Sequence, residues 1–315
     1  MVVPGQRNDL KELGCKIYDK WTMLNGISTN HYTLDLSTEL AAHMTLLLTE
    51  CSPAGVVMAS DSAITQIDAK GRIVEIDQQG WLKVLKAPKA RAAVGYWGFI
   101  GKIHRGRFDE WLRKVIDRAT YSDVASLGAC LADALNKACG NKPLDDDQCA
   151  GLHVAGFHSW SDGQRRPFFL HVHNGPGHIA IEHVTQQLPQ GMRLLEVRPC
   201  LVAGPRTLFE SHQDFPSSDA TLEDNLDALQ RGYTTRNGDF FYYSVVWDAL
   251  QRSFNYLNLI PGFSIPSNPS SLGARRGLLV AALETTIRVY RCSNKSRIIA
   301  GKVTSQAIGP DGYLH

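Results

Sequence analysis

Two short apolar segments, residues 46–51 and 56–60, constrain the fold of this chain more than any other feature. Between them stands Ser52-Pro53-Ala54-Gly55, whose Pro and Gly favour a tight turn. The second segment, Val56-Val57-Met58-Ala59-Ser60, is almost wholly apolar, which is typical of a fully buried strand. The two segments predict a β-hairpin, and a hairpin implies antiparallel pairing because parallel strands need long crossovers.

Further strands and helices follow in alternating blocks. Apolar periodicity predicts a second hairpin and then two helices, each with one apolar stripe, the second capped by Ser122. The expected hairpin strands are residues 81–86 and 90–95, and the expected helices are 108–119 and 124–138. Strands are then expected at 151–158, 167–173, 178–184 and 195–202, helices at 222–231, 240–257 and 278–290, and a closing strand or strand pair within 297–308.

This order of elements predicts the fold class. Two strand blocks, each followed by helices, favour an α+β fold with two mainly antiparallel sheets that face each other and helices outside them, a four-layer α-β-β-α sandwich. A single mixed sheet with helices on one face is the alternative. No internal repeat and no long linker divides the chain, so we expect one domain over residues 45–315, preceded by an irregular segment, residues 1–44.

The composition narrows the classes of function. Of 315 residues, 43% are hydrophobic and 20% are charged, so the chain can bury a core and the bulk of it is not disordered. Lys and Arg number 33 against 31 Asp and Glu, and the net charge of +2 gives no electrostatic reason to expect nucleic acid or an anionic membrane as partner. No apolar stretch approaches the ~20 residues of a membrane-spanning helix.

Cysteine usage and the N-terminal segment point to a cytoplasmic protein. The seven cysteines are an odd number and form no C-x-x-C pair, which argues against a disulfide framework and against a zinc ribbon. No basic segment followed by an apolar run and a small-residue cleavage site marks a signal peptide. We therefore expect a protein of a reducing compartment.

The stretch with the most chemical information surrounds the first hairpin. Thr45 comes directly before the first predicted strand, Asp61 and Ser62 follow the second 16 residues later, and Lys83 lies at the next hairpin. This pattern resembles the opening of a proteasome-type, β-subunit-like peptidase of the N-terminal-nucleophile hydrolase superfamily. In that family a Thr begins the mature chain, an Asp-Ser pair ends the second strand, and a Lys heads the next one. The resemblance is specific over residues 45–98 and follows the order of elements to about residue 183; residues 298–303 also resemble the family's closing strand.

The resemblance implies a catalytic set. Thr45 would be the nucleophile and, through its α-amine, the base; Lys83 would tune that base, with Lys86 and Lys89 as alternatives. Asp61 would hold Lys83, Ser62 would support the network, and Gly98 would donate its N–H to the oxyanion. No cofactor and no metal are needed. The wall of the pocket that receives the substrate side chain before the cleaved bond (the S1 pocket) would consist of Ile64, Leu85, Gly95 and Phe99. An apolar wall of this kind favours cleavage after apolar or neutral residues.

Elementary chemistry supports the same set. A Thr hydroxyl needs a base to remove its proton, and an α-amine with a pKa of ~7.7–8.0 is suited to that work. A neighbouring Lys would lower the pKa of the amine, and a buried Lys needs a counter-ion such as Asp61 because a lone buried charge costs several kcal/mol. Taken alone, Thr45 is more simply interpreted as an ordinary strand residue, and Lys83 as a surface residue.

The proposed chemistry requires a free α-amine on Thr45, so the fate of residues 1–44 decides whether the chain can be catalytic. They are interpreted as a propeptide removed by autolysis, or as a non-native upstream extension with Met44 as the true start, whose removal would expose Thr45. If the extension stays attached, the chain is a catalytically silent subunit.

Four histidines close together in the sequence raise the question of a metal site. His171 and His173 lie two apart on a predicted strand and therefore share a face, with His178 and His183 nearby. Without a carboxylate or Cys at ligand spacing, ordinary strand histidines are favoured over a metal site.

The sequence thus predicts a proteasome-like threonine peptidase that acts on peptides or unfolded protein and assembles into a homo-oligomeric ring. The resemblance alone implies an ATPase unfoldase as partner. The alternatives are a non-catalytic assembly or scaffold subunit, and a small-molecule amidase on the same fold.

Overall fold

The computed structural model describes most of the chain from Thr45 onward. The described residues are 45–67, 73–77, 80–98, 100–141, 150–159, 162–174, 178–187, 193–202, 210–212, 229–230, 232–238, 241–262, 264–265, 269–292 and 299–314. All described residues belong to one compact unit, Ala41–His315. The expected leader, residues 1–44, lies outside the described residues.

The first sheet is built on the predicted hairpin. Its strands are β1 (Leu46–Ser52), β2 (Gly55–Ser60), β12 (Tyr233–Gly238), β13 (Thr304–Gly309) and β14 (Gly312–Tyr313), in the order β12-β1-β2-β13-β14 with antiparallel pairing throughout. Gly55 opens β2 with φ +134°, and a Cβ there would lie 2.2 Å from the carbonyl oxygen of Ile308 on β13. Only Gly allows β13 to approach at this point.

The second sheet contains the second predicted hairpin. Its strands are β5 (Val84–Ala87), β6 (Ala92–Gly98), β7 (Ala150–Ser159), β8 (Arg165–His173) and β11 (Glu210–His212), in the order β11-β8-β7-β6-β5, again antiparallel. Two-stranded sheets are formed by β3 (Ile64–Ile67) with β4 (Ile73–Asp77) and by β9 (His178–Gln187) with β10 (Arg193–Val202). The alternative of a single mixed sheet is therefore wrong, because the described strands form two large antiparallel sheets, as expected, and two smaller ones.

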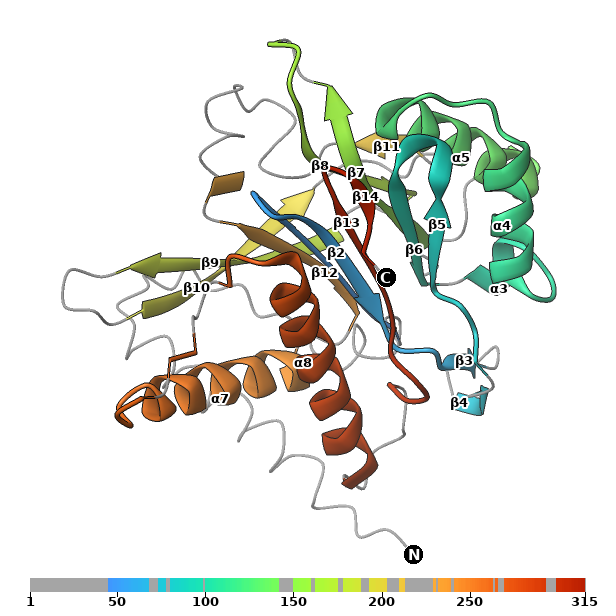
Figure 1. Ribbon diagram of the computed structural model, residues 1–315. Helices are drawn as coiled ribbons and strands as arrows, with labels where there is room; N and C mark the ends of the chain where they lie inside the picture. The colour runs from blue at the N-terminus through green and yellow to red at the C-terminus, as the bar shows by residue number, and fades with distance from the viewer. Residues whose placement is uncertain are drawn as a thin grey trace, which may run out of the picture. The chain divides into compact units, whose positions relative to one another are not determined.

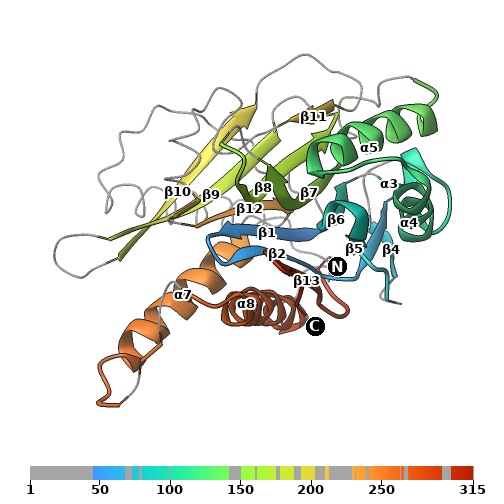
Figure 2. The same cartoon turned by 45° about the horizontal axis from the view of Figure 1, so that its top comes forward.

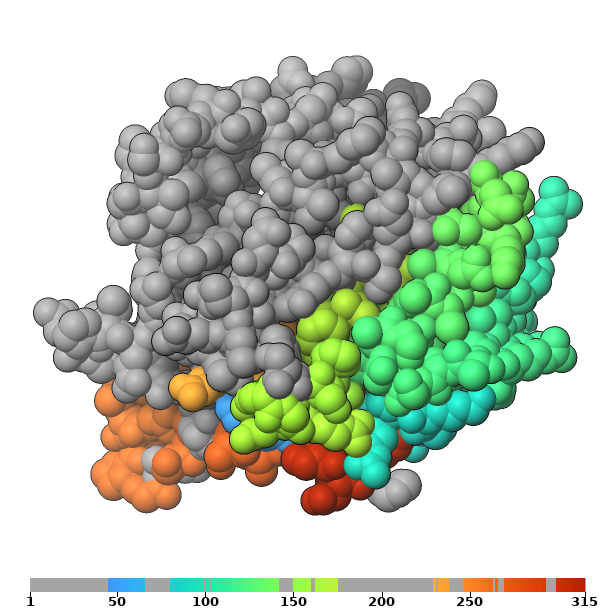
Figure 3. All heavy atoms as spheres, turned by 90° about the horizontal axis from the view of Figure 1, so that it is seen from above, coloured from blue at the N-terminus to red at the C-terminus, as the bar shows by residue number. Residues whose placement is uncertain are grey.

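Helices pack on the outer faces of the two large sheets (Figures 1 and 2). They are α3 (Ile100–Ile103), α4 (Phe108–Arg118), α5 (Val124–Ala138), α7 (Phe241–Leu257) and α8 (Leu272–Cys292), with a 3-10 turn η1 (Pro88–Ala90) between β5 and β6. Helix α5 packs on β7 and β8, whereas α8 packs on β2 and β13 and against α7. Figure 3 shows the orange residues of α7 and the green residues of α4 and α5 at opposite ends of the coloured surface.

The alternation of side chains along β1 explains this packing. Leu46 and Leu48 belong to the apolar cluster under α8, whereas Leu47 and Cys51 belong to the cluster that also contains Phe169 of the second sheet. A strand whose two faces are both covered reads as a continuous apolar run, which is what the sequence shows. A third cluster lies between the second sheet and helices α4 and α5.

Several expected elements need correction. Helix α5 is capped by Asp123, not Ser122, because the Asp123 carboxylate accepts from the N–H of Ser126 while the Ser126 hydroxyl accepts from the N–H of Asp123. The closing strand begins at Thr304. Strands β3, β4, β11, β12 and β14 were not predicted, and β12 pairs with the edge of β1. Most of the helix expected at 222–231 lies outside the described residues.

Candidate active site

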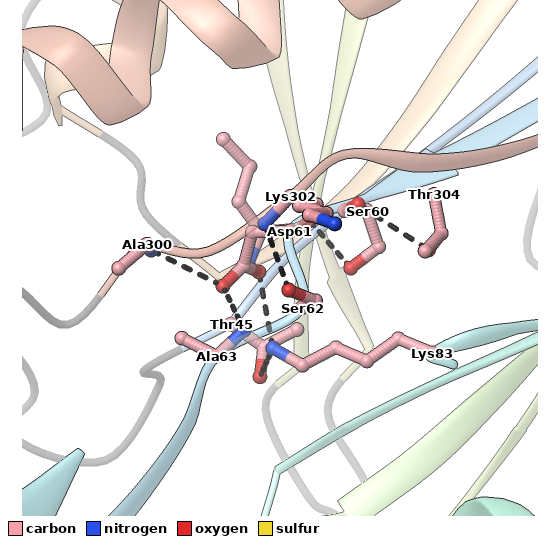
Figure 4. A network of polar contacts seen from close by, with 10 residues as sticks. Thr45, Ser60, Asp61, Ser62, Ala63, Lys83, Ala300, Lys302 and Thr304 are labelled. Atoms are coloured by element: carbon pink, nitrogen blue, oxygen red, sulfur yellow. Dashed lines mark hydrogen bonds and ion pairs between the residues drawn. The ribbon is translucent and has the colours of Figure 1, made fainter. Parts of the chain in front are cut away.

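The predicted catalytic residues lie where three strands begin or end. Thr45 directly precedes β1, Asp61 directly follows β2, and Lys83 directly precedes β5 on the second sheet. The register of the hairpin pairs Leu47 with Ser60, which brings Thr45 and Asp61 to the same end of the first sheet. Figure 4 shows the Lys83 side chain extending to this end from the other sheet.

Lys83 connects the other two residues. Its Nζ donates to Thr45 Oγ1 at 3.1 Å and to Asp61 Oδ1 at 3.0 Å. Lys83 and Asp61 are fully buried, and Thr45 retains 8% exposure. The structure thus brings together three residues separated by up to 38 positions, and places the lysine amine beside the threonine hydroxyl.

The two alternative lysines lie elsewhere. Lys86 is exposed, with its Nζ 4.8 Å from the centre of the Tyr313 ring. Lys89 is also exposed and donates to the carbonyl oxygens of Asp117 and Ala119 at the end of α4. Among the three, Lys83 is the lysine at Thr45.

Asp61 is held by four donors. Its Oδ1 accepts from Lys83 and from the N–H of Leu46 at 3.1 Å, and its Oδ2 accepts from the N–H of Ala63 at 3.2 Å and of Ala300 at 3.5 Å. A buried carboxylate with this many donors is well stabilised as an anion. Asp61 therefore fixes the first residue of β1 and supplies the counter-ion that the lysine needs.

Burial governs the electrostatics of Lys83. Burial lowers the pKa of its amine below the usual 10.5, because the charged form is desolvated, and the attraction and hydrogen bond of Asp61 oppose this effect only in part. Lys83 presents its Nζ as a hydrogen-bond donor to the hydroxyl oxygen of Thr45.

Ser62 occupies a structural position behind Asp61. Its hydroxyl oxygen accepts from the N–H of Lys302 at 2.8 Å. Gly301 has φ +82°, and a Cβ there would lie 2.3 Å from Ser62 Oγ. A backbone clasp on Asp61 and Ser62 is thus formed by Ala300, Gly301 and Lys302. The sequence predicted a closing strand in this region but not these contacts.

Gly98 ends β6 with φ +82° and pairs in register with Ala150. This left-handed conformation favours Gly. Its role as an oxyanion donor stays a prediction.

The expected S1 wall is wrong in one member. A Cβ on Gly95 would lie 2.6 Å from Leu47 Cδ1 and 2.9 Å from Met58 Sδ, so Gly95 faces the filled layer between the sheets and leaves no roomy pocket. Its cross-strand neighbour is Val84, whereas Leu85 pairs with Val94 and shares the helix-side cluster with it. Ile64 packs against that cluster too, and Phe99 lies outside the described residues.

The predicted common face of His171 and His173 is confirmed. Both are buried, and their ring centres lie 4.4 Å apart. His153 on β7 joins them: its Nδ1 hydrogen-bonds to the hydroxyl of Thr49 at 2.8 Å, and its Nε2 to Asn237 on β12. The side chains of His178 and His183 lie outside the described residues. Within the described part of the chain, no group of three or more His, Cys, Asp and Glu residues could hold a metal ion.

None of the helices described is both long and apolar enough to cross a membrane. The thiols of Cys51, Cys130, Cys139 and Cys292 are free.

Comparison with known proteins finds similarity to solved structures at low sequence identity. It matches no protein-family model and no curated protein. Among solved structures, it is similar to a Gly-1 mutant of Anbu from Hyphomicrobium sp. strain MC1, with 11% identity over 86% of this chain and 85% of that one and a TM-score of 0.43. It is also similar to Anbu, an ancestral β-subunit, from Yersinia bercovieri, with 10% identity, 83% and 80% coverage and a TM-score of 0.40.

Proposed function

We propose that this protein is a threonine hydrolase of the N-terminal-nucleophile type, a proteasome-like peptidase on a four-layer α-β-β-α sandwich. One observation carries the proposal: the buried amine of Lys83 lies 3.1 Å from Thr45 Oγ1 and 3.0 Å from Asp61 Oδ1, and Thr45 directly precedes strand β1. A fully buried lysine is rare and is most often paired or functional.

The proposed reaction has two steps. Thr45 Oγ attacks the carbonyl carbon of a peptide bond, its proton passes to the α-amine of Thr45, and the amine of the leaving peptide takes that proton as the C–N bond breaks. Water then attacks the acyl ester, gives one proton through the α-amine to Thr45 Oγ, and releases the acid. The N–H of Gly98 stabilises the oxyanion in both steps, a contribution of the kind that is worth ~10²–10³ in rate.

The other residues support the nucleophile. The Lys83 cation disfavours a protonated α-amine beside it and so keeps the base free. Asp61 holds Lys83, and Ser62 holds the clasp of residues 300–302 against Asp61. This chemistry requires that Thr45 be the first residue of the working protein, either after autolysis of residues 1–44 or through a start at Met44.

The test combines the N-terminus with activity. Mass spectrometry of the purified native protein should show a chain that begins at Thr45, and a panel of fluorogenic peptides should be hydrolysed, with preference for apolar or neutral residues. Thr45→Ala should abolish hydrolysis, whereas Thr285→Ala, which removes a half-buried hydroxyl on α8 that donates to the carbonyl oxygen of Ala281, should leave it unchanged. An assembled protein with Met1 intact, or full hydrolysis by Thr45→Ala, would remove the peptidase proposal.

Two other functions remain as outcomes of the same test. A protein that keeps residues 1–44 and has no activity is a non-catalytic assembly or scaffold subunit. A monomer that hydrolyses small amides but no peptides is an amidase. We propose a homo-oligomeric ring in the cytoplasm for the peptidase, with an ATPase unfoldase as partner, and sizing of the native particle separates the ring from the monomer.

A further inference from the structure

The backbone that carries Lys83 lies outside the strand ladder. Residues 80–83 precede β5, which begins at Val84. On the downstream side, the carbonyl oxygen of Lys83 accepts from the N–H of Tyr96 at 3.2 Å. On the upstream side, a side chain of a different element holds the segment, and that side chain is Asp109.

Asp109 lies in the first turn of α4 and is 1% exposed. Its Oδ2 accepts from the N–H of Leu82 at 3.2 Å, one residue before Lys83. Arg107 donates to the same carboxylate with both arms of its guanidinium, Nε to Oδ1 at 2.9 Å and Nη2 to Oδ2 at 2.7 Å. Such a two-point pair fixes the direction of the carboxylate as well as its place.

Arg107 fixes the same segment a second time. Its guanidinium lies over the Trp81 ring, 4.6 Å from the ring centre. Burial raises the pKa of Asp109, but the hydrogen bonds from Arg107 and from the N–H of Leu82 outweigh it and the pKa is lowered. Asp109 is therefore an anion at neutral pH. Arg107 orients its carboxylate, and the carboxylate in turn holds the N–H of Leu82.

From these contacts we infer that Asp109, oriented by Arg107, is the positioning residue for Lys83. It anchors the backbone at Leu82, so that the Lys83 amine ends at Thr45 and Asp61. The inference deepens the proposed function and rests on it for its effect on rate. Misplacement of a catalytic group by about 1 Å can cost ~10²-fold in rate.

The test uses the native protein, with Thr45 as its first residue, and three single variants. Asp109→Ala removes the acceptor of the Leu82 N–H and the partner of Arg107, whereas Asp109→Asn keeps an acceptor oxygen. Asp123→Ala is the matched control, because Asp123 likewise accepts from a backbone N–H at the start of a helix, but the hydrogen-bond partners of its carboxylate are Ser122 and Ser126 of its own segment. We expect kcat to fall about 10- to 100-fold in Asp109→Ala with little change in KM, to recover largely in Asp109→Asn, and to stay at the wild-type value in Asp123→Ala.

Two readouts report on Lys83 itself. The acid limb of the pH profile should move to higher pH in Asp109→Ala, because a displaced Lys83 no longer lowers the pKa of the Thr45 amine. The ¹³Cε resonance of Lys83, followed through pH without substrate, should titrate at higher pH in the same variant as the amine gains solvent. Asp123→Ala should leave both unchanged.

These outcomes separate the inference from the proposed function. A wild-type protein without hydrolase activity overturns the proposed function, and the Lys83 resonance still decides whether Asp109 positions Lys83. An unchanged resonance and pH profile in Asp109→Ala overturn the inference alone. If Asp109→Ala does not fold, Arg107→Met keeps the Asp109 carboxylate but removes the arginine that orients it. The ¹³Cε resonance of Lys83 should then shift in the same direction, and an unchanged resonance overturns the inference.

Discussion

Lys83 Nζ and Asp61 Oδ1 lie 3.0 Å apart, with both side chains fully buried. The pair joins the two sheets, because Asp61 ends β2 of the first sheet and Lys83 precedes β5 of the second. A pair of this kind stabilises little against an apolar replacement of both partners, but removal of one partner leaves a buried charge. Its location at Thr45 therefore points to chemistry rather than to stability.

Loss of Lys83 alone should cost much more stability than loss of the whole pair. Lys83→Met leaves the Asp61 carboxylate buried without its cation, which should lower the free energy of unfolding by ~3–5 kcal/mol. The double variant Lys83→Met/Asp61→Asn should recover a large part of that loss while remaining inactive. Urea unfolding of the wild type, both single variants and the double variant measures the coupling; additive losses would contradict a buried, interacting pair.

The lowered pKa of Lys83 should make stability depend on alkaline pH. Between that lowered pKa and the ordinary 10.5, the unfolded chain binds more protons at this residue than the folded chain does. The contribution of Lys83 to the free energy of unfolding should therefore rise with pH across this window. The measurement is the difference between wild type and Lys83→Met in urea unfolding from neutral pH to 10.5. A difference that stays flat or falls would show that burial does not dominate.

Gly301 should tolerate no side chain. Gly301→Ala introduces a Cβ into a left-handed backbone, φ +82°, and against Ser62 Oγ at 2.3 Å. Gly262 is the matched control, since its φ is +83° and no atom of the described residues lies within 4 Å of a Cβ there. Gly262→Ala should cost only the ~1–2 kcal/mol of the left-handed conformation, and Gly301→Ala should cost more and reduce hydrolysis. Equal losses in thermal or urea unfolding would mean that the clasp can shift freely.

The sequence was informative where one local pattern determines one local structure. The first hairpin, the helix over residues 124–138 and the common face of His171 and His173 all follow from period and turn residues. Thr45, Asp61 and Lys83 could be proposed together because each directly precedes or follows a predicted strand, and the resemblance supplied their spacing. Two antiparallel sheets also followed from the order of the elements.

The missed features depend on contacts between distant segments. The N–H of Leu82 and the carboxylate of Asp109 meet across 27 residues, and no spacing rule predicts such a bond; the only signal was an acidic residue in the first turn of a helix. The error at Gly95 has the same origin, because Leu47 and Met58, from the other sheet, fill the space that a missing side chain had suggested was open.

The Glu50–Arg275 pair should show the opposite dependence on pH. Burial raises the pKa of Glu50 above the usual 4.5, although Arg275 on α8 attracts it and hydrogen-bonds to it. Between 4.5 and the raised value the folded chain binds more protons at Glu50, so this residue's contribution to stability falls as pH rises through that window.

Arg275→Met removes the cation and raises the pKa of Glu50 further. At neutral pH we expect a loss of ~3–5 kcal/mol in the free energy of unfolding, because the Glu50 carboxylate is left buried without its partner. The loss should shrink as the pH is lowered towards 4.5 and Glu50 becomes protonated. Arg288→Met, an exposed site on the same helix, should change stability by no more than ~0.5 kcal/mol at any of these pH values. Urea unfolding of the three proteins across this range measures both effects, and a loss from Arg275→Met that is independent of pH would show that packing of the arginine, rather than its charge, stabilises the contact between α8 and β1.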